Sequence, residues 1–272
     1  MRIRTSTRTS EVLMSKHVNP RMQGVTYNLL HNGVSLTYYG GEGLILPSDF
    51  HDNMAAHESV LRQITKNHRI TQAVVPDFRG ATRRATLEKD LRPFGPSSTF
   101  FGTSPTDAVV TDLPVISITA DCHTLVVKNA RNGMRAVVHG SRDAQHPIAR
   151  DGKTKSGNTN VFEALNPALF GSETYAFIAC GIGSSHFDNR TDYDEFHGSL
   201  IRYLVRKWGG DIVDGGIEMG RLNVPLLLRR QLEARGVPGD NIAWDGIDTY
   251  TDPRFNSRRA GSKASNCLVI EW

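Results

Sequence analysis

Residues 114–140 read PVISITADCHTLVVKNARNGMRAVVHG, and this stretch decides the fold. Its apolar, β-branched runs predict three closely spaced strands, Pro114–Thr119, Thr124–Lys128 and Arg135–His139. The polar segment Asn129–Gly133 predicts a short turn between the last two strands, which are therefore expected to pair antiparallel in one sheet. That pairing places the start of one strand beside the end of the other. We therefore expect Cys122 and His139 to meet at one edge of the sheet.

Outward from this stretch, hairpin, strand and helix patterns alternate. Val25–Leu30 and Val34–Tyr39 alternate apolar and polar residues around Asn32-Gly33, which is a strong hairpin signal. Further strands are predicted at Thr71–Val75, Thr174–Ala179 and Leu268–Glu271, and helices at Met54–Lys66, Asp194–Lys207 and Val224–Arg235. Because the elements follow no regular strand–helix–strand rhythm, the pattern predicts a layered α+β protein with mixed sheets and flanking helices.

Length and composition narrow the class of protein. The chain has 272 residues, of which 39% are hydrophobic and 22% charged, so it is neither a disordered nor a coiled-coil chain. A single domain over residues 1–272 is expected, with a flexible, Arg- and Ser-rich end over residues 1–20. The net charge of +4 does not indicate nucleic-acid binding, but it suits an anionic small molecule. Sparse cysteines and the lack of a long apolar run favour a cytoplasmic, non-membrane protein.

A thiol beside an imidazole supports two kinds of chemistry. His139 can take the proton of Cys122 and leave a thiolate nucleophile. Alternatively, both side chains can hold zinc or another metal that tolerates sulfur, with one position open for water. A buried, inert cysteine and an ordinary surface histidine are the structural alternative to both.

A glycine-rich turn follows the predicted strand that ends at Ala179. Gly181 and Gly183 would let a ligand approach the backbone, whose amides can bind an anion, and His186 could reach the same site. The structural alternative is a tight turn that needs the two glycines for its own shape. Cys180 is expected to be a small core residue.

Several arginines are candidates for binding an anionic substrate. Arg258 and Arg259 could bind phosphate or carboxylate through paired hydrogen bonds. Arg142 follows His139 closely and could orient a substrate or pair with its neighbour Asp143. Arg79 begins a basic stretch that is either an anion site or a solvated face.

Segments in the same order along the chain resemble the YfiH-like laccase-domain (polyphenol oxidase) family. Thr119–Cys122 followed by Val138–Gly140 is similar to the family's TADC…H pattern. Thr106–Thr111 resembles its ADALVT segment, Ala179–Gly183 its GPxIG turn, Gln231–Val237 its late helix ending in GV, and Asp248–Tyr250 with Phe255–Arg259 its CTY…FFSYRR segment. The similarity runs from about Met54 to the C-terminus.

This resemblance implies a layered α/β/β/α sandwich, also found in the deamidase domain of cytotoxic necrotizing factor toxins. It further implies an enzyme acting on purine nucleosides, by phosphorolysis or adenosine deamination, and an amidase role in peptidoglycan editing is attributed to some members. In the family, one cysteine and two histidines hold a metal, such as zinc or copper. Cys122 and His139 match the cysteine and the second histidine.

The first metal-binding histidine of the family pattern is replaced. Arg79 stands at that position, and an arginine cannot ligate a metal. Asp121, His123 or His186 would then have to supply the third ligand. Without a metal, Cys122 and His139 would act as a thiol dyad, and Arg79 beside them would favour a thiolate and an anionic substrate.

Three functions fit these residues. The first is a purine nucleoside enzyme in which Cys122, His139 and Asp121 form the catalytic site and Arg258 or Arg259 binds phosphate. The second is a metal-free amidase, deamidase or acyl-transfer hydrolase, in which Cys122 attacks a carbonyl and the amides of 181–185 stabilise the oxyanion. The third is a relative that binds a small-molecule ligand without turning it over.

Overall fold

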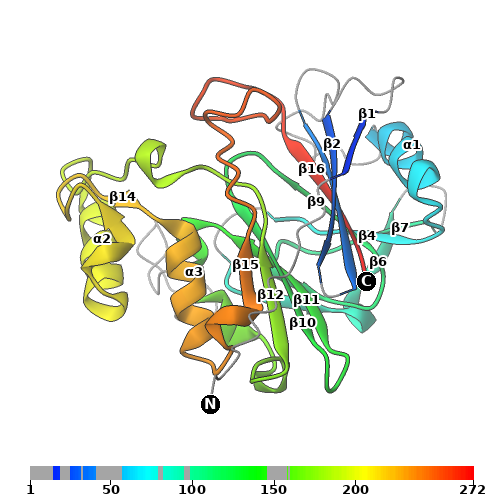
Figure 1. Ribbon diagram of the computed structural model, residues 1–272, viewed down its shortest axis with the longest axis horizontal. Coiled ribbons are helices and arrows are strands. Elements are labelled where there is room, and N and C mark those ends of the chain that lie inside the picture. The colour runs from blue at the N-terminus through cyan, green and yellow to red at the C-terminus, as the bar shows by residue number, and fades with distance from the viewer. Residues whose placement is uncertain are drawn as a thin grey trace, which may run out of the picture.

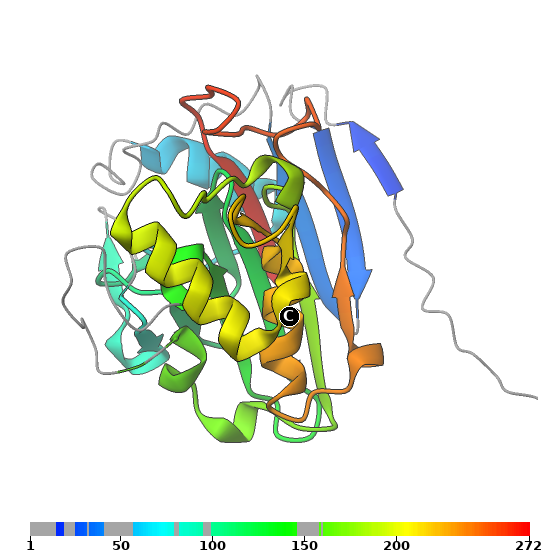
Figure 2. The ribbon, with the colours of Figure 1, turned by 90° about the vertical axis from the view of Figure 1, so that its left-hand side faces the viewer.

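Two β-sheets lie face to face between helices in the computed structural model, which describes residues 15–18, 25–31, 33–40, 57–78, 82–94, 99–145, 158 and 160–272. Helix α1 (Glu58–His68) covers the outer face of one sheet, and α2 (Glu195–Trp208) and α3 (Val224–Glu233) lie on the other side of the molecule (Figure 1). The α+β prediction and the α/β/β/α layering are thus confirmed. Figure 2 shows α2 and α3 side by side in front of the sheets.

Both sheets are mixed. In the described part of the chain, the larger sheet has the strand order β1 (Ser15–Val18), β2 (Val25–His31), β3 (Val34–Tyr39), β16 (Asn266–Glu271), β9 (Val115–Thr119), β4 (Ala73–Val75), β7 (Phe100–Gly102) and β6 (Arg92–Phe94). The smaller sheet has the order β15 (Ile242–Trp244), β12 (Thr174–Ile178), β10 (His123–Asn129), β11 (Arg135–Gly140), β8 (Ala108–Val110) and β5 (Ala85–Leu87). A separate short ribbon pairs β13 (Val213–Asp214) with β14 (Arg221–Leu222).

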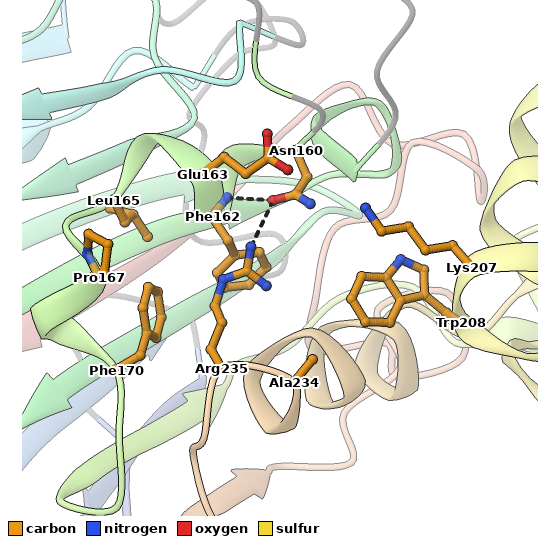
Figure 3. Close-up of a pocket in the computed structure, with 10 residues that line it drawn as sticks. All are labelled: Asn160, Phe162, Glu163, Leu165, Pro167, Phe170, Lys207, Trp208, Ala234 and Arg235. Atoms are coloured by element: carbon orange, nitrogen blue, oxygen red, sulfur yellow. Dashed lines mark hydrogen bonds between the residues drawn. The ribbon is translucent and has the colours of Figure 1, made fainter.

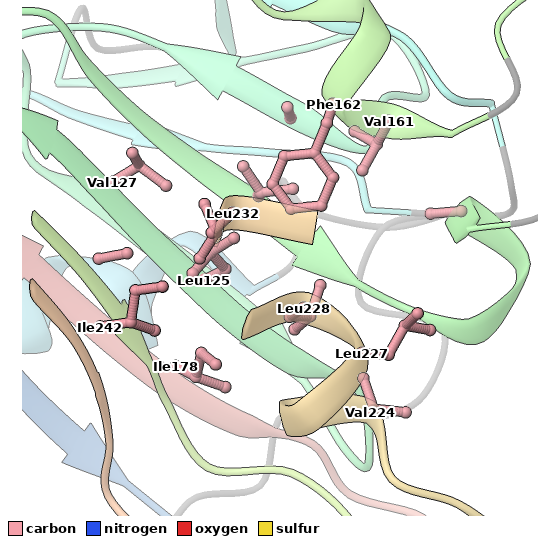
Figure 4. Close-up of a cluster of buried hydrophobic side chains, with 14 of the residues drawn as sticks. Leu125, Val127, Val161, Phe162, Ile178, Val224, Leu227, Leu228, Leu232 and Ile242 are labelled. Carbon is pink, nitrogen blue, oxygen red and sulfur yellow. The ribbon is translucent and has the colours of Figure 1, made fainter. Parts of the chain in front are cut away.

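Alternation along the strands fills the layers between these elements. On β10, Leu125 and Val127 face α3 and its neighbours, whereas Val126 between them faces the larger sheet. Figure 4 shows Leu125 and Val127 packed with side chains of α3 such as Leu228 and Leu232. Since both faces of β10 are buried, its sequence is an almost continuous apolar run.

Several predicted elements differ from the structure by one or two residues at their ends. The first helix ends two residues later than predicted, at His68, because Arg69 adopts a left-handed conformation with φ of 57°. Its predicted start falls outside the described residues. The third helix ends at Glu233 rather than at Arg235. Of the N-terminal stretch expected to be flexible, Ser15–Val18 form β1, which pairs with β2, and the remainder falls outside the described residues.

A partly buried hydrogen bond connects the two sheets. The hydroxyl of Tyr38, on β3, donates to Oδ2 of Asp245, which follows β15, over 2.6 Å. Burial raises the pKa of Asp245 to about 7, although the hydroxyl of Tyr38 and the amides of Ile247 and Cys180 favour the carboxylate. Asp245 is therefore protonated in the folded chain over a range of pH in which an exposed aspartate is ionised.

We expect this carboxyl group to make stability fall as the pH rises. Between about pH 4 and pH 7 the folded chain keeps a proton that the unfolded chain releases, so the free energy of unfolding decreases across this window. Asp245→Asn removes the titration and should flatten the decrease, as measured by urea unfolding at about pH 5 and about pH 7.5. The control is Asp240→Asn, at an exposed position. Equal pH dependence in the parent and Asp245→Asn would contradict the expectation.

Candidate active site

The candidate site forms where the chain passes from the larger sheet to the smaller one. Cys122 lies in the connection between β9 and β10, and Thr124 on β10 is paired with His139 on β11. Cys122 lies close enough to the imidazole of His139 to raise the pKa of that ring. His139 is buried and Cys122 is partly exposed. The structure thus brings together the thiol and the imidazole that the sequence placed at one sheet edge.

Asp107 extends this pair to three residues. Its Oδ1 lies 3.3 Å from Nδ1 of His139, and its backbone carbonyl accepts from the amide of His139 over 2.8 Å. The other carboxylate oxygen accepts from the hydroxyl of Thr82 and the amide of Arg83. The fully buried carboxylate is therefore fixed on both oxygens and orients the imidazole. Because Nδ1 faces Asp107, Nε2 is the nitrogen left for the thiol of Cys122.

Two further side chains enclose the imidazole and the carboxylate. The ring of Phe78 is stacked on that of His139, with 5.2 Å between centroids and 7° between planes. Arg83 is fully buried, and burial lowers its pKa while Asp107 and Asp143 act in the opposite direction. The ring of His139 is therefore covered by an aromatic side chain on one face and lies near charged side chains on another side.

The charges around His139 favour its protonated form. Burial alone would disfavour an imidazolium, but the neighbouring Cys122 and the carboxylate of Asp107 outweigh burial and raise the pKa of His139 to about 10. At neutral pH the imidazole therefore carries a proton beside the sulfur. An imidazolium next to a cysteine is the arrangement that favours a thiolate nucleophile.

The other two cysteines differ from Cys122. Cys180 and Cys267 are both buried, and burial raises the pKa of each thiol. Both belong to the hydrophobic core, as expected for Cys180. Cys122 is the thiol that solvent can reach.

Each of the three residues considered as a substitute metal ligand has other partners. The two ring nitrogens of His123 face the carbonyl oxygens of Ala179 and Ile182, at 2.9 and 3.3 Å. The carboxylate of Asp121 accepts from the hydroxyl of Thr249 and the amide of Arg259, both over 3.1 Å. Nδ1 of His186 lies 3.1 Å from Asp248, and its ring stacks on Tyr250 with 4.2 Å between centroids.

The described residues do not supply a donor set for a zinc or copper centre. Within the described ranges, no group of three histidine, cysteine, aspartate or glutamate side chains is placed to hold a metal ion. Cys122 and His139 supply two donors, whereas zinc sites in proteins take three or four. Arg79, which replaces the first histidine of the family pattern, lies outside the described residues.

The glycine-rich turn satisfies its own backbone. The amides of Gly181 and Ile182 donate to the carbonyls of Ile247 and Asp121, over 3.4 and 2.8 Å. The amide of Gly183 donates to Oδ1 of Asp248 over 2.8 Å. These bonds hold the turn against the loop that carries Asp248. A Cβ at Gly181 or Gly183 would lie 2.5 Å from the ring of His123 or 2.6 Å from the carboxylate of Asp248, so close packing accounts for both glycines without an anion.

Gly181→Ala is expected to destabilise the fold. A Cβ at this position would lie 2.5 Å from the ring of His123, which is buried and bonded on both nitrogens. Overpacking of this kind costs about 1–3 kcal/mol, measured as a lower urea midpoint. The control is Gly210→Ala, where a Cβ meets nothing within 4 Å and φ is not positive. Equal midpoints for the two variants would refute the expectation.

The predicted arginines lie in different surroundings. Arg142 donates to Asn189 over 2.6 Å and lies 3.0 Å from Nε2 of His197, so it connects the segment after β11 to the first turn of α2. The guanidinium of Arg259 lies over the ring of Phe187, 5.3 Å from its centroid. Arg258 and Arg259 are both exposed. Arg259 also donates to the carbonyl of Asp188 over 3.2 Å, and Arg258 to the hydroxyl of Ser265 over 3.5 Å. All three arginines therefore have protein partners, and Arg258 and Arg259 are in addition exposed to solvent.

The layered fold and a cysteine–histidine pair at the sheet junction define a laccase-domain protein. The model of the multi-copper polyphenol oxidoreductase laccase family matches residues 31–268, so the chain belongs to this family, which is generally enzymatic.

Among solved structures, the fold is similar to the hypothetical protein YfiH of Bacillus licheniformis, with a TM-score of 0.64 and 18% identity over 90% of this chain and 96% of that one. YlmD of Geobacillus stearothermophilus is similar with a TM-score of 0.64 and 16% identity, over 94% of this chain and 98% of that one. A Neisseria meningitidis protein of family DUF152 is similar with a TM-score of 0.62 and 15% identity, over 89% and 95% of the two chains.

A search of curated protein sequences found no match. None of the described helices is both long and apolar enough to cross a membrane.

Proposed function

We propose that this protein is a thiol-dependent hydrolase that cleaves the C–N bond of a carboxamide. The observation that carries the proposal is the placement of Cys122 beside His139, whose Nδ1 lies 3.3 Å from the buried carboxylate of Asp107. Nucleophile, base and orienting carboxylate in this order are the components of a cysteine-hydrolase site. Cys122 is the nucleophile, His139 transfers protons, and Asp107 is a positioning residue.

This arrangement supports a two-step reaction. The thiolate of Cys122 attacks the amide carbonyl, and the imidazolium of His139 gives its proton to the leaving nitrogen. The C–N bond breaks, ammonia or an amine departs, and a thioester to Cys122 remains. Neutral His139 then takes a proton from water, the resulting hydroxide attacks the thioester, and the carboxylic acid leaves as the thiolate and imidazolium re-form.

A second candidate, implied by the resemblance to the YfiH-like laccase-domain family, is action on purine nucleosides. The same residues can deaminate adenosine without a metal. Cys122 would attack the ring carbon that bears the amino group, His139 would protonate the departing ammonia, and water would displace the sulfur to give inosine. Phosphorolysis would in addition use the exposed Arg258 or Arg259 to bind phosphate.

The test separates these reactions. Purified protein is incubated with glutamine peptides, with adenosine, and with inosine plus phosphate, before and after dialysis against a chelator. We expect ammonia from a carboxamide at an unchanged rate after chelation. Ammonia from adenosine alone would support the second candidate, and turnover that disappears on chelation and returns with zinc or copper would overturn the thiol mechanism. No turnover of any substrate would favour a ligand-binding relative.

A further inference from the structure

A cavity lies away from Cys122, at the ends of α2 and α3. Its volume of about 660 Å³ is within the usual range for small-molecule sites. Its walls combine aromatic rings, from Phe162, Phe170 and Trp208, with two cations, Lys207 and Arg235. Figure 3 shows Lys207 and Trp208 on one side of the cavity and Arg235 with Phe162 on the other.

The cavity is separate from the candidate active site. Arg142, which follows His139 closely in sequence, contacts His197 in the first turn of α2. Trp208, at the cavity, is the last residue of this 14-residue helix. A helix of this length spans about 21 Å. The cavity lining also shares no residue with the candidate active site around Cys122 and His139.

Arg235 is a cation in partly apolar surroundings. Its guanidinium lies 4.9 Å from the ring centroid of Phe162 and 5.7 Å from that of Phe170. It donates to the carbonyl of Gln231 over 2.9 Å and, over 3.4 Å, to Oδ1 of Asn160. Burial lowers its pKa, which nearby Glu163 partly offsets. Among the described residues, no carboxylate forms an ion pair with Arg235, so part of its hydrogen-bonding capacity is left for a ligand.

The opposite wall offers a second cation and a ring. Nζ of Lys207 lies 5.4 Å from the ring centroid of Trp208 and donates to the hydroxyl of Tyr203 over 3.2 Å. Lys207 is exposed and Trp208 partly so. An ammonium next to a ring face can hold an anionic group and an aromatic ring at once.

Basic residues near helix C-termini often complement the helix dipole, which would account for Lys207 and Arg235 separately. The helix dipole does not account for a cavity between Lys207 and Arg235 or for the aromatic residues that line it. We propose that the cavity binds a planar aromatic anion, its ring against Trp208 and its anionic group between Lys207 and Arg235. Glu163 is exposed at the same cavity. Its single negative charge is outnumbered by the positive charges of Lys207 and Arg235, so the lining carries a net positive charge.

Calorimetric titration with 1-naphthyl phosphate tests the proposal, with 1-naphthoate as a carboxylate arm. We expect binding about tenfold or more tighter than that of 1-naphthol or of inorganic phosphate, since ring and charge contribute together. Equal or weaker binding than either component alone would overturn the proposal. Tighter binding of the phosphate or of the carboxylate identifies the anionic group preferred.

Lys207→Gln and Arg206→Gln form a matched pair on the last turn of α2, since both side chains are exposed and only Lys207 lines the cavity. Lys207→Gln should weaken 1-naphthyl phosphate binding about tenfold and Arg206→Gln should not. Equal losses would mean non-specific attraction by a basic surface and would overturn the site. Binding should be unchanged in Cys122→Ala, which separates this inference from the proposed hydrolase.

Discussion

Cys122→Ala is expected to abolish hydrolysis, with a loss of about a thousandfold or more, because the variant has no nucleophile to form the thioester. Its far-UV spectrum and urea midpoint should stay close to those of the parent, since Cys122 is partly exposed and outside the three core clusters. Turnover is followed as ammonia released from the best carboxamide.

The matched control is Cys180→Ala, which removes a buried thiol from the core between the sheets and should keep turnover. Alkylation gives an independent measurement. Iodoacetamide at neutral pH should add one label per chain, at Cys122 and faster than to glutathione, because the imidazolium of His139 lies beside this sulfur and the other two thiols are buried. Slow labelling, or full turnover by Cys122→Ala, would end the nucleophile assignment.

Asp107→Asn should reduce turnover by about a hundredfold to ten-thousandfold, the range seen when the carboxylate behind a catalytic histidine becomes an amide. The variant keeps the size of the side chain but removes the charge that faces Nδ1 of His139. Because this charge helps to raise the pKa of His139 to about 10, the imidazolium should be lost at a lower pH in the variant. The alkaline limb of the rate profile should therefore move to lower pH.

A loss of stability alone would not move the alkaline limb of the rate profile to lower pH. Asp107 also accepts from Thr82 and the amide of Arg83, so the variant will be less stable, but a purely structural role would leave the alkaline limb in place. Asp112→Asn is the control, because Asp112 is exposed and close to Asp107 in sequence. An unmoved alkaline limb in Asp107→Asn would contradict a positioning role for Asp107.

The sequence predicted the elements whose side-chain pattern is long enough to be periodic. The hairpin of β2 and β3, the antiparallel pair of β10 and β11, and helices α2 and α3 are confirmed, with boundaries shifted by one or two residues. Strands β5, β6, β7, β8 and β15 were not predicted. Each has three residues, which is too short for an alternation to be distinguished from a loop.

The residues of the candidate site could likewise be predicted only in part. Cys122 and His139 could be placed together because a five-residue turn sets the register of β10 against β11. Asp107 was not predicted as a site residue, because it reaches His139 through the pairing of β8 with β11, across 32 positions and without a short turn to signal it. The segment Thr106–Thr111 was noted only for its resemblance to the family. The partners of Asp121 and His186 lie even further along the chain, at Thr249, Arg259 and Asp248.

The route of the chain through the site has a consequence for how activity can be lost. Cys122 lies on the crossing from β9 in one sheet to β10 in the other, and Phe78, which stacks on His139, follows β4 of the opposite sheet. The sulfur of Cys122 and the imidazole of His139 therefore lie at the boundary between the two sheets. A small slip of one layer over the other would move Phe78 off His139 and shift the connection that carries Cys122, while the strands kept their own hydrogen bonds. We therefore expect activity to be lost at a lower temperature than the circular dichroism signal of the strands.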